Sequence, residues 1–209
     1  MDRQYPIREQ RKAETRQKLI NAARELFLEK GYEATTLEGI AAKAGLHSQT
    51  LYRHFSSKVE LAAAGEAEQL THFRSAISEK PADLSTIQFW KQYVVQAASQ
   101  VIGDDKGETY REVLHEELQS PIITQQLVQL GLVYKELLMT SIEAELAIAD
   151  PDERRAAARL IAITLWGAHE DMMTRYEREG GFDLVTEIVR TINRVETFCR
   201  PLFKLSGEI

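Results

Sequence analysis

The stretch TTLEGIAAKAGLHSQTLYRHFSSKVEL, residues Thr35 to Leu61, decides how this chain folds. Apolar residues at helical spacing predict two short helices, and they are Leu37, Ile40, Ala41 and Ala44 in the first and Leu51 and Phe55 in the second. Gly45 lies between them and can adopt the left-handed conformation that a tight turn requires. Two short helices joined in this way form a helix-turn-helix, whose second helix can lie in the major groove of DNA.

The flanking residues predict where these two helices begin and end. Thr35 and Glu38 have the spacing of a capping box, so we expect the first helix to begin at Thr35 or Thr36. The second helix is expected to run from residue 47 or 48 to residue 55. Both helices are only about two turns long, which is typical of a small DNA-binding domain rather than of a long helical bundle.

The rest of the chain also has helical periodicity. One apolar stripe predicts a helix from about Ala13 to Lys30, and Ser56 with Ser57 opens a long fourth helix. After Pro81 no segment alternates polar and apolar residues as a strand would, and breaks are expected near residues 79–83, 103–107, 120–121, 150–152 and 180–181. We therefore predict an all-α fold.

Two C-terminal segments carry more apolar surface than one chain readily covers. The run LIAITLWGA, Leu160 to Ala168, is apolar around nearly the whole helix, so we expect it to be covered on several sides. The last helix has an apolar stripe that consists of Leu184, Ile188, Ile192, Val195, Cys199 and Leu202. Together they suggest an intermolecular four-helix bundle, and burial within one monomer is the alternative.

Charge divides the chain into two parts of opposite sign. Residues 1–58 hold 11 Lys and Arg against 7 Asp and Glu, a net charge of +4, whereas residues 59–209 hold 15 against 25, a net charge of −10. A basic head on an acidic body is expected when one small module faces phosphates. A chance fluctuation in composition is the alternative.

Composition excludes several other classes of protein. The 209 residues are 44% hydrophobic and 28% charged, enough to bury a core. No run of about 20 apolar residues is present, and the N-terminus lacks the apolar segment of a signal peptide, so we expect no membrane span and a cytoplasmic protein. Cys199 is the only cysteine and is interpreted as a buried helix residue.

Residues 19–61 resemble the N-terminal DNA-binding domain of the TetR family. The resemblance rests on residue type and spacing, and it is carried by Leu26, Phe27, Gly31, Tyr32, Thr35, Thr36, Ile40, Ala41, Ala44, Gly45, Leu51, Tyr52, Phe55 and Lys58. It implies a helix-turn-helix domain over residues 1–58 and a larger helical domain over residues 59–209. The larger domain would form a homodimer and bind a small-molecule effector. Effector binding would release the dimer from a palindromic DNA operator. Members of the family are most often repressors.

The resemblance also implies roles for particular residues in binding double-stranded DNA. Contacts to DNA phosphates are expected from Thr36, Tyr52, His54 and Lys58. Side chains on the exposed face of the second helix are expected to read bases, and they are Ser48, Gln49, Thr50 and Arg53. For each of these the alternative is a solvated polar residue. A basic N-terminal arm of Arg3, Arg8, Arg11, Lys12 and Arg16 either touches DNA or is a disordered tail.

Two positions depart from the family's usual pattern. His47 stands where a small hydroxyl residue usually caps the second helix, so Ser48 is a possible cap instead, which would shift the start of the helix by one residue. Gln49 stands where a small residue is common. Its longer side chain adds a possible base contact, so the operator sequence cannot be carried over from the family.

The effector site predicted for the larger domain combines aromatic and polar residues. Its apolar and aromatic candidates are Phe89, Trp90, Tyr93, Leu118, Leu137, Trp166, His169, Met172 and Met173. Its candidate polar anchors are Gln96, His115 and Glu116. The alternative for the aromatic residues is an ordinary helix-bundle core.

No constellation in the sequence predicts an enzyme, a metal site or a cofactor. The sole thiol lies in an apolar helix, no glycine-rich phosphate loop is present, and the five histidines are scattered. An all-helical protein-interaction module is the better rival to a DNA regulator, because amphipathic helices would serve it equally. Tyr52, Arg53, His54 and Lys58 beside a glycine turn favour the regulator, since a protein-binding bundle has no need of them.

Overall fold

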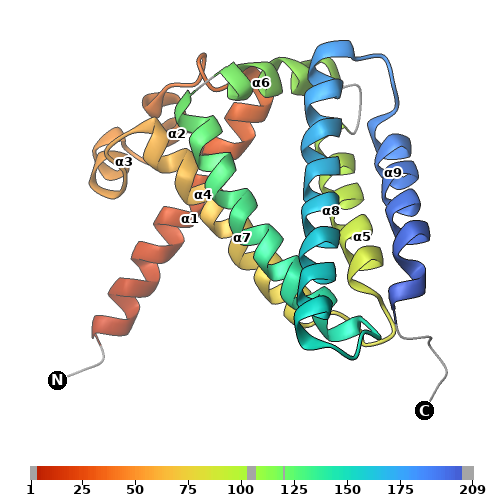
Figure 1. Ribbon diagram of the computed structural model, residues 1–209. Coiled ribbons are helices and arrows are strands. Elements are labelled where there is room, and N and C mark those ends of the chain that lie inside the picture. Colours follow the sequence, from red (N-terminus) through yellow and green to blue (C-terminus); the bar gives the residue numbers. More distant parts are fainter. Residues whose placement is uncertain (1–3, 103–106, 120, 204–209) are drawn as a thin grey trace. The chain divides into compact units, whose positions relative to one another are not determined.

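The computed structural model describes residues 4–102, 107–119 and 121–203, and within these leaves the side chains of some helical residues aside. In chain order the helices are α1 (Gln4–Lys30), α2 (Leu37–Lys43), α3 (Ser48–His54), α4 (Lys58–Ser78), α5 (Thr86–Ile102), α6 (Gly107–Gln119), α7 (Pro121–Glu145), α8 (Pro151–Glu179), α9 (Leu184–Cys199) and the 3-10 helix η1 (Arg200–Leu202) (Figure 1). An isolated β-bridge pairs Leu146 with Phe203, and the described residues contain no named strand. The all-α prediction is confirmed.

The helix boundaries correct the sequence prediction at one end and agree with it at several breaks. The first helix begins at Gln4 rather than near Ala13, so the polar segment that precedes the apolar stripe is helical as well. The expected breaks near residues 79–83, 150–152 and 180–181 separate α4 from α5, α7 from α8 and α8 from α9. Residues 103–106 and 120, where two other breaks were expected, lie outside the described residues.

Contacts divide the chain into two compact units. The first unit contains the described residues up to Gln69 together with Glu112–Gln126, and the second contains those of Leu70–Arg111 and from Leu127 on. The helices α4, α6 and α7 each contribute residues to both units. The functional boundary expected between residues 58 and 59 remains a prediction.

The first unit is held together by a small apolar core that joins α1, α2, α3 and the start of α4. Its buried members are Leu19, Ile20, Ala22, Ala23, Leu26, Ile40, Ala41, Leu51, Phe55 and Leu61. Ile40 and Leu51 are completely buried, which fixes α3 against α2. Removing either side chain would leave a cavity in this core.

In the second unit α9 packs along both α5 and α8 (Figure 1). The stripe of the last helix faces these neighbours, because Leu184, Ile188, Ile192 and Val195 are buried within the chain. This part of the stripe therefore follows the monomer alternative. The run from Leu160 is only partly covered, because Leu160 is 66% exposed while Leu165 is completely buried.

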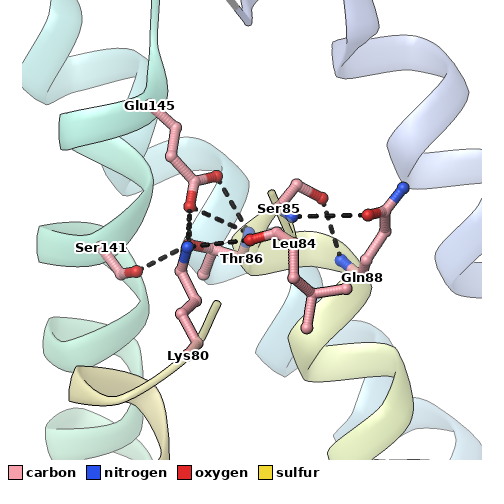
Figure 2. Close-up of polar contacts among 7 residues, drawn as sticks. All are labelled: Lys80, Leu84, Ser85, Thr86, Gln88, Ser141 and Glu145. Atoms are coloured by element: carbon pink, nitrogen blue, oxygen red, sulfur yellow. Dashed lines mark hydrogen bonds and ion pairs between the residues drawn. The ribbon is translucent and has the colours of Figure 1, made fainter. Parts of the chain in front are cut away.

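A polar network fixes the start of α5 to the end of α7 (Figure 2). Glu145 accepts hydrogen bonds from the Thr86 backbone N–H at 2.9 Å and from the Thr86 hydroxyl at 2.6 Å, and it pairs with Lys80 at 2.7 Å. A carboxylate at a helix N-terminus satisfies unpaired N–H groups and complements the helix dipole. Ser85 and Gln88 add a reciprocal capping box, so the helix that carries three aromatic side chains has a defined start.

Candidate nucleic-acid interface

The start of α2 is set by Thr36. Its side-chain oxygen accepts a hydrogen bond from the Gly39 backbone N–H at 3.1 Å, so Thr36 is the N-cap and the capping box expected between Thr35 and Glu38 does not form. Thr35 is buried and donates instead to the carbonyls of Gly31, at 2.7 Å, and Leu26, at 3.2 Å. Thr35 thus satisfies carbonyls at the end of α1, whereas Thr36 caps the start of α2 and keeps an exposed hydroxyl.

The turn after α2 has the geometry that the glycine predicted. Gly45 has a φ of 70°, in the left-handed region, and its N–H donates to Ala42 O while that of Leu46 donates to Ala41 O. These two hydrogen bonds form a Schellman motif, which ends a helix and redirects the chain. The next helix, α3, begins after His47, whose side chain makes no capping hydrogen bond. Ser48 is therefore the first residue of α3, and the alternative in which it serves as the cap is wrong.

The α3 helix separates its apolar and polar side chains clearly. Leu51 is completely buried and Phe55, just past the helix, is 1% exposed. Gln49, Tyr52 and Arg53 are exposed on the opposite side. The remaining predicted contact residues on this helix, which are Ser48, Thr50 and His54, are half-buried. Buried anchors thus hold in place a short helix whose polar face is free to meet another molecule.

Tyr52 is oriented by an acidic residue of α2. Its hydroxyl donates to Glu38 Oε1 at 2.6 Å, although half of the Tyr52 side chain is exposed. The hydrogen bond from Tyr52 holds the pKa of the Glu38 carboxyl below its usual value and raises the pKa of Tyr52. Glu38 was not among the predicted site residues. The two partners are 14 positions apart, which is no helical spacing that could have revealed the pair.

Lys58 binds the backbone of the segment between α1 and α2. Its ammonium group donates to the carbonyls of Tyr32 at 2.6 Å, Thr35 at 3.1 Å and Glu33 at 3.4 Å, and lies 4.2 Å from the centre of the Tyr32 ring. These contacts occupy the three N–H donors of a lysine. Lys58 therefore fixes the approach to α2, a role that the sequence prediction did not include.

The end of α3 is held by Arg16 of α1. The Arg16 guanidinium donates to the His54 backbone carbonyl at 3.4 Å and lies 4.2 Å from the centre of the Phe55 ring. Burial, followed by the nearby charges of Arg53, Arg16 and Lys12, lowers the pKa of His54. Arg8, Arg11 and Lys12 are exposed on α1 rather than on a disordered tail, and Arg3 lies outside the described residues.

The second unit contains a cluster of aromatic rings, which we call the Trp90 cluster. It consists of Phe73, Phe89, Trp90, Tyr93, Tyr134, Trp166 and His169. Five of these were predicted effector residues, and the structure brings them together. Phe73 and Tyr134 were missed, because nothing in the local patterns of α4 and α7 distinguishes them from ordinary core residues.

Other predicted effector residues lie elsewhere or have other partners. Met172 is buried, Leu137 and Met173 are half-buried, and the Met173 sulfur accepts a hydrogen bond from Tyr110 at 3.7 Å. Gln96 is exposed to solvent. The last three predicted residues fall in the part of the chain assigned to the first unit, where His115 is exposed, Leu118 is half-buried and the Glu116 side chain lies outside the described residues.

The part of the chain that the structure describes lacks two kinds of feature. No helix there is both long enough and apolar enough to cross a membrane. Within the same ranges, no group of three or more His, Cys, Asp or Glu side chains could hold a metal ion.

Comparison with known proteins connects this geometry to one group of regulators. The family described as bacterial regulatory proteins, tetR family, matches residues 19–64. The HTH-type transcriptional regulator TcmR of Streptomyces glaucescens is 39% identical over 82 residues, which span 39% of this chain and 36% of TcmR. The uncharacterized HTH-type transcriptional regulator TtgW of Pseudomonas putida is 30% identical over 128 residues, which span 61% of this chain and 87% of TtgW.

A solved structure extends the likeness of fold to nearly the whole chain. SmeT, the repressor of the multidrug efflux pump SmeDEF of Stenotrophomonas maltophilia, matches in its complex with triclosan with a TM-score of 0.63. The match covers 93% of this chain and 94% of that one at 16% sequence identity, so it bears on the fold alone.

Proposed function

Because the chain belongs to the TetR family of bacterial regulatory proteins, we propose that it is a dimeric regulator of transcription, most simply a repressor, which a small-molecule effector releases from a palindromic DNA operator. The first relatives match over only part of their length, TcmR over 36% of it. Operator, effector and assembly are therefore argued from this chain's own residues.

The observation that carries the proposal is the division of α3 into a buried and an exposed side. Leu51 and Phe55 anchor the helix, while Gln49 and Arg53 are exposed and have the groups that read bases in a major groove. A Gln amide can bind adenine with two hydrogen bonds, and an Arg guanidinium can bind guanine in the same way. Ser48 and Thr50, which are half-buried on the same short helix, are proposed to make the remaining base contacts.

Phosphate contacts are proposed for Thr36, Tyr52, His54 and Lys58. The Thr36 hydroxyl accepts from Gly39 and keeps its own proton for a phosphate oxygen. Tyr52 would exchange Glu38 for a phosphate, since both are anionic acceptors. Lys58 would have to give up one carbonyl partner in order to bind phosphate directly, so its principal role is to fix the approach to α2.

Dimer formation is supported by apolar side chains that this chain leaves uncovered on α8 and α9. On α8, Leu160 is 66% exposed and Ile163 is 49% exposed, and these residues are one turn apart. On α9, Phe198 is 83% exposed. The two helices pack against each other, so a second copy of the chain could cover both and complete a four-helix bundle.

Effector binding is proposed for the Trp90 cluster of the second unit. The cluster gathers five residues that the sequence marked as candidates, and its described members combine aromatic surface with a few polar nitrogens. Binding sites for small molecules commonly have this composition. The triclosan complex of SmeT is consistent with an effector of aromatic character in a protein of the same fold.

Selection of binding sites from a pool of random duplex DNA tests the proposal. We expect enrichment of a palindrome whose half-sites lie about one helical turn, 34–36 Å, apart. Gln49→Ala should change the preferred base at one position of each half-site. Leu160→Glu should prevent dimerisation, so palindromic sequences should no longer be enriched. Failure of the folded wild-type dimer to enrich any sequence would favour the alternative function, an all-helical protein-interaction module.

A further inference from the structure

Three polar nitrogen atoms of the Trp90 cluster are buried and have no hydrogen-bond partner among the residues that the structure describes. They are Nε1 of Trp90, Nε1 of Trp166 and Nδ1 of His169. Trp90 is 1% exposed and Trp166 is 8% exposed. Buried polar atoms in folded proteins nearly always have a partner, so three unpaired atoms in one place require an explanation.

The three rings form one contiguous site. The ring centres of Trp90 and Trp166 lie 6.0 Å apart, those of Trp90 and His169 lie 5.9 Å apart, and those of Trp166 and His169 lie 5.6 Å apart. Trp90 belongs to α5, whereas the other two rings belong to α8. The three unpaired nitrogens therefore belong to rings that contact one another, so a single bound molecule is the simplest partner for them.

Chemistry restricts what that molecule can be. An indole N–H can only donate, so the two tryptophans require acceptor atoms. Burial lowers the pKa of His169 to about 4, so its ring is neutral at physiological pH and offers no positive charge to an anion. The rings around Trp90 belong to Phe73, Tyr93 and Tyr134, which favour a flat aromatic partner.

We propose that the Trp90 cluster binds an uncharged, planar aromatic compound whose oxygen acceptors receive hydrogen bonds from the indole N–H groups of Trp90 and Trp166. His169 Nδ1 is the third polar contact, and it exchanges a hydrogen bond with a hydroxyl or carbonyl of the ligand. The inference rests on the proposed function, because it gives the chemical class of the effector that the regulator would bind.

The chain offers a direct probe of this site, because Trp90 and Trp166 are its only tryptophans. In the 15N-labelled full-length protein, the two indole N–H signals can be assigned with Trp90→Phe and Trp166→Phe. Three aryl methyl ketones of increasing size serve as ligands, namely acetophenone, 2-acetylnaphthalene and 4-acetylbiphenyl. Each has two matched controls, an ethyl analogue that lacks the acceptor and a carboxylate that adds a charge.

We expect at least one ketone to shift an indole proton signal downfield in a saturable manner. Its ethyl and carboxylate analogues should bind about ten-fold more weakly or worse, because each leaves buried groups unpaired or buries an unpaired charge. Trp166→Phe keeps an aromatic ring but removes one donor, so it should reduce the affinity for the ketone and leave that for the ethyl analogue unchanged. The comparison among ligands in the wild-type protein does not depend on this variant being folded.

Three results would overturn the inference. They are equal affinity for ketone and ethyl analogue, preference for the carboxylate, and no saturable shift with any ketone, which would mean that water alone satisfies these nitrogens. Because this titration contains no DNA, its failure leaves the regulator itself untouched. Conversely, ketone binding that does not alter affinity for the selected operator would contradict the effector mechanism while leaving the binding site intact.

Discussion

The helix-turn-helix and the Trp90 cluster differ in whether their polar atoms have hydrogen-bond partners. In the helix-turn-helix, Thr35 donates to two backbone carbonyls, Lys58 donates to three, and Tyr52 donates to Glu38. In the Trp90 cluster, two indole nitrogens and an imidazole nitrogen are buried and find no partner in the described part of the chain. Polar groups that have hydrogen-bond partners fix one geometry, whereas buried polar groups without partners can gain hydrogen bonds from a bound molecule.

This difference matches the two roles proposed for this chain, the reading of DNA and the binding of an effector. A surface that reads DNA has to keep a constant shape, because displacing a base-reading side chain by about 1 Å loses its hydrogen bond. A site that responds to a ligand has to change when the ligand enters, so part of its stability should be supplied by the ligand. The following experiments test the contrast, from the largest expected effect to the smallest.

Leu51→Ala should have the largest effect, because it removes the buried anchor of α3. We expect a loss of about 2–5 kcal/mol in the unfolding free energy of the first unit and loss of specific DNA binding. Urea unfolding followed by circular dichroism measures the change, with the exposed Gln49→Ala as the matched control. A loss below about 1 kcal/mol would mean that α3 is not held by this core.

His169 provides a pH test of the second region. Its pKa is about 4 in the folded state against 6.5 for a free imidazole, so the unfolded chain takes up a proton first as the pH falls. Stability from this group is complete above pH 6.5 and is lost down to pH 4, by up to about 3 kcal/mol. Unfolding at pH 7.0 and 4.5 should show a smaller loss for His169→Phe than for the wild type. Equal losses would indicate that the imidazole has a partner or is solvated.

Gln49→Ala should change specificity by about 1–3 kcal/mol at one base pair of each half-site while leaving non-specific affinity nearly unchanged. Competition binding with duplexes that differ at single positions measures this effect. Gln129→Ala on α7 makes the same chemical change at another exposed glutamine and should not alter base preference. If Gln49→Ala weakened binding to every sequence alike, Gln49 would be a phosphate contact instead.

Tyr52→Phe and Glu38→Gln should give small effects of opposite sign. Removing the Tyr52 hydroxyl takes away one phosphate partner and should weaken binding to all sequences by about 1 kcal/mol. Glu38→Gln removes a carboxylate that competes for that hydroxyl and repels DNA, so it should tighten binding to all sequences by a few fold. Fluorescence anisotropy with operator and scrambled duplexes measures both changes. Weaker binding by Glu38→Gln would show instead that Glu38 positions Tyr52 for its contact.

Local patterns predicted the architecture of the first region well. The apolar spacing of Ile40 and Leu51 and the single glycine at Gly45 define two helices and a turn, and all three appear in the structure. Family membership and the all-α fold are confirmed. The assigned DNA and effector contacts remain predictions.

Most of the features that could not be predicted from the sequence depend on contacts between segments that are distant in the chain. Thr36 rather than Thr35 is the N-cap because of the way α1 ends. The Thr35 hydroxyl already donates hydrogen bonds to the carbonyls of Gly31 and Leu26. The helical start of α1 was missed because its first residues have no apolar stripe, although most of them are good helix formers. Phe73 and Tyr134 join the Trp90 cluster only through packing, which no local periodicity encodes.

The most direct test of the central claim is the ratio of affinities for a selected palindromic duplex and for a scrambled duplex of the same composition, measured at physiological salt. If α3 reads bases in a dimer, the palindrome should bind at least about 1,000-fold more tightly, and scrambling one half-site should remove most of that advantage. Equal affinity of the folded dimer for both duplexes would contradict the assignment of α3 as a reader of sequence.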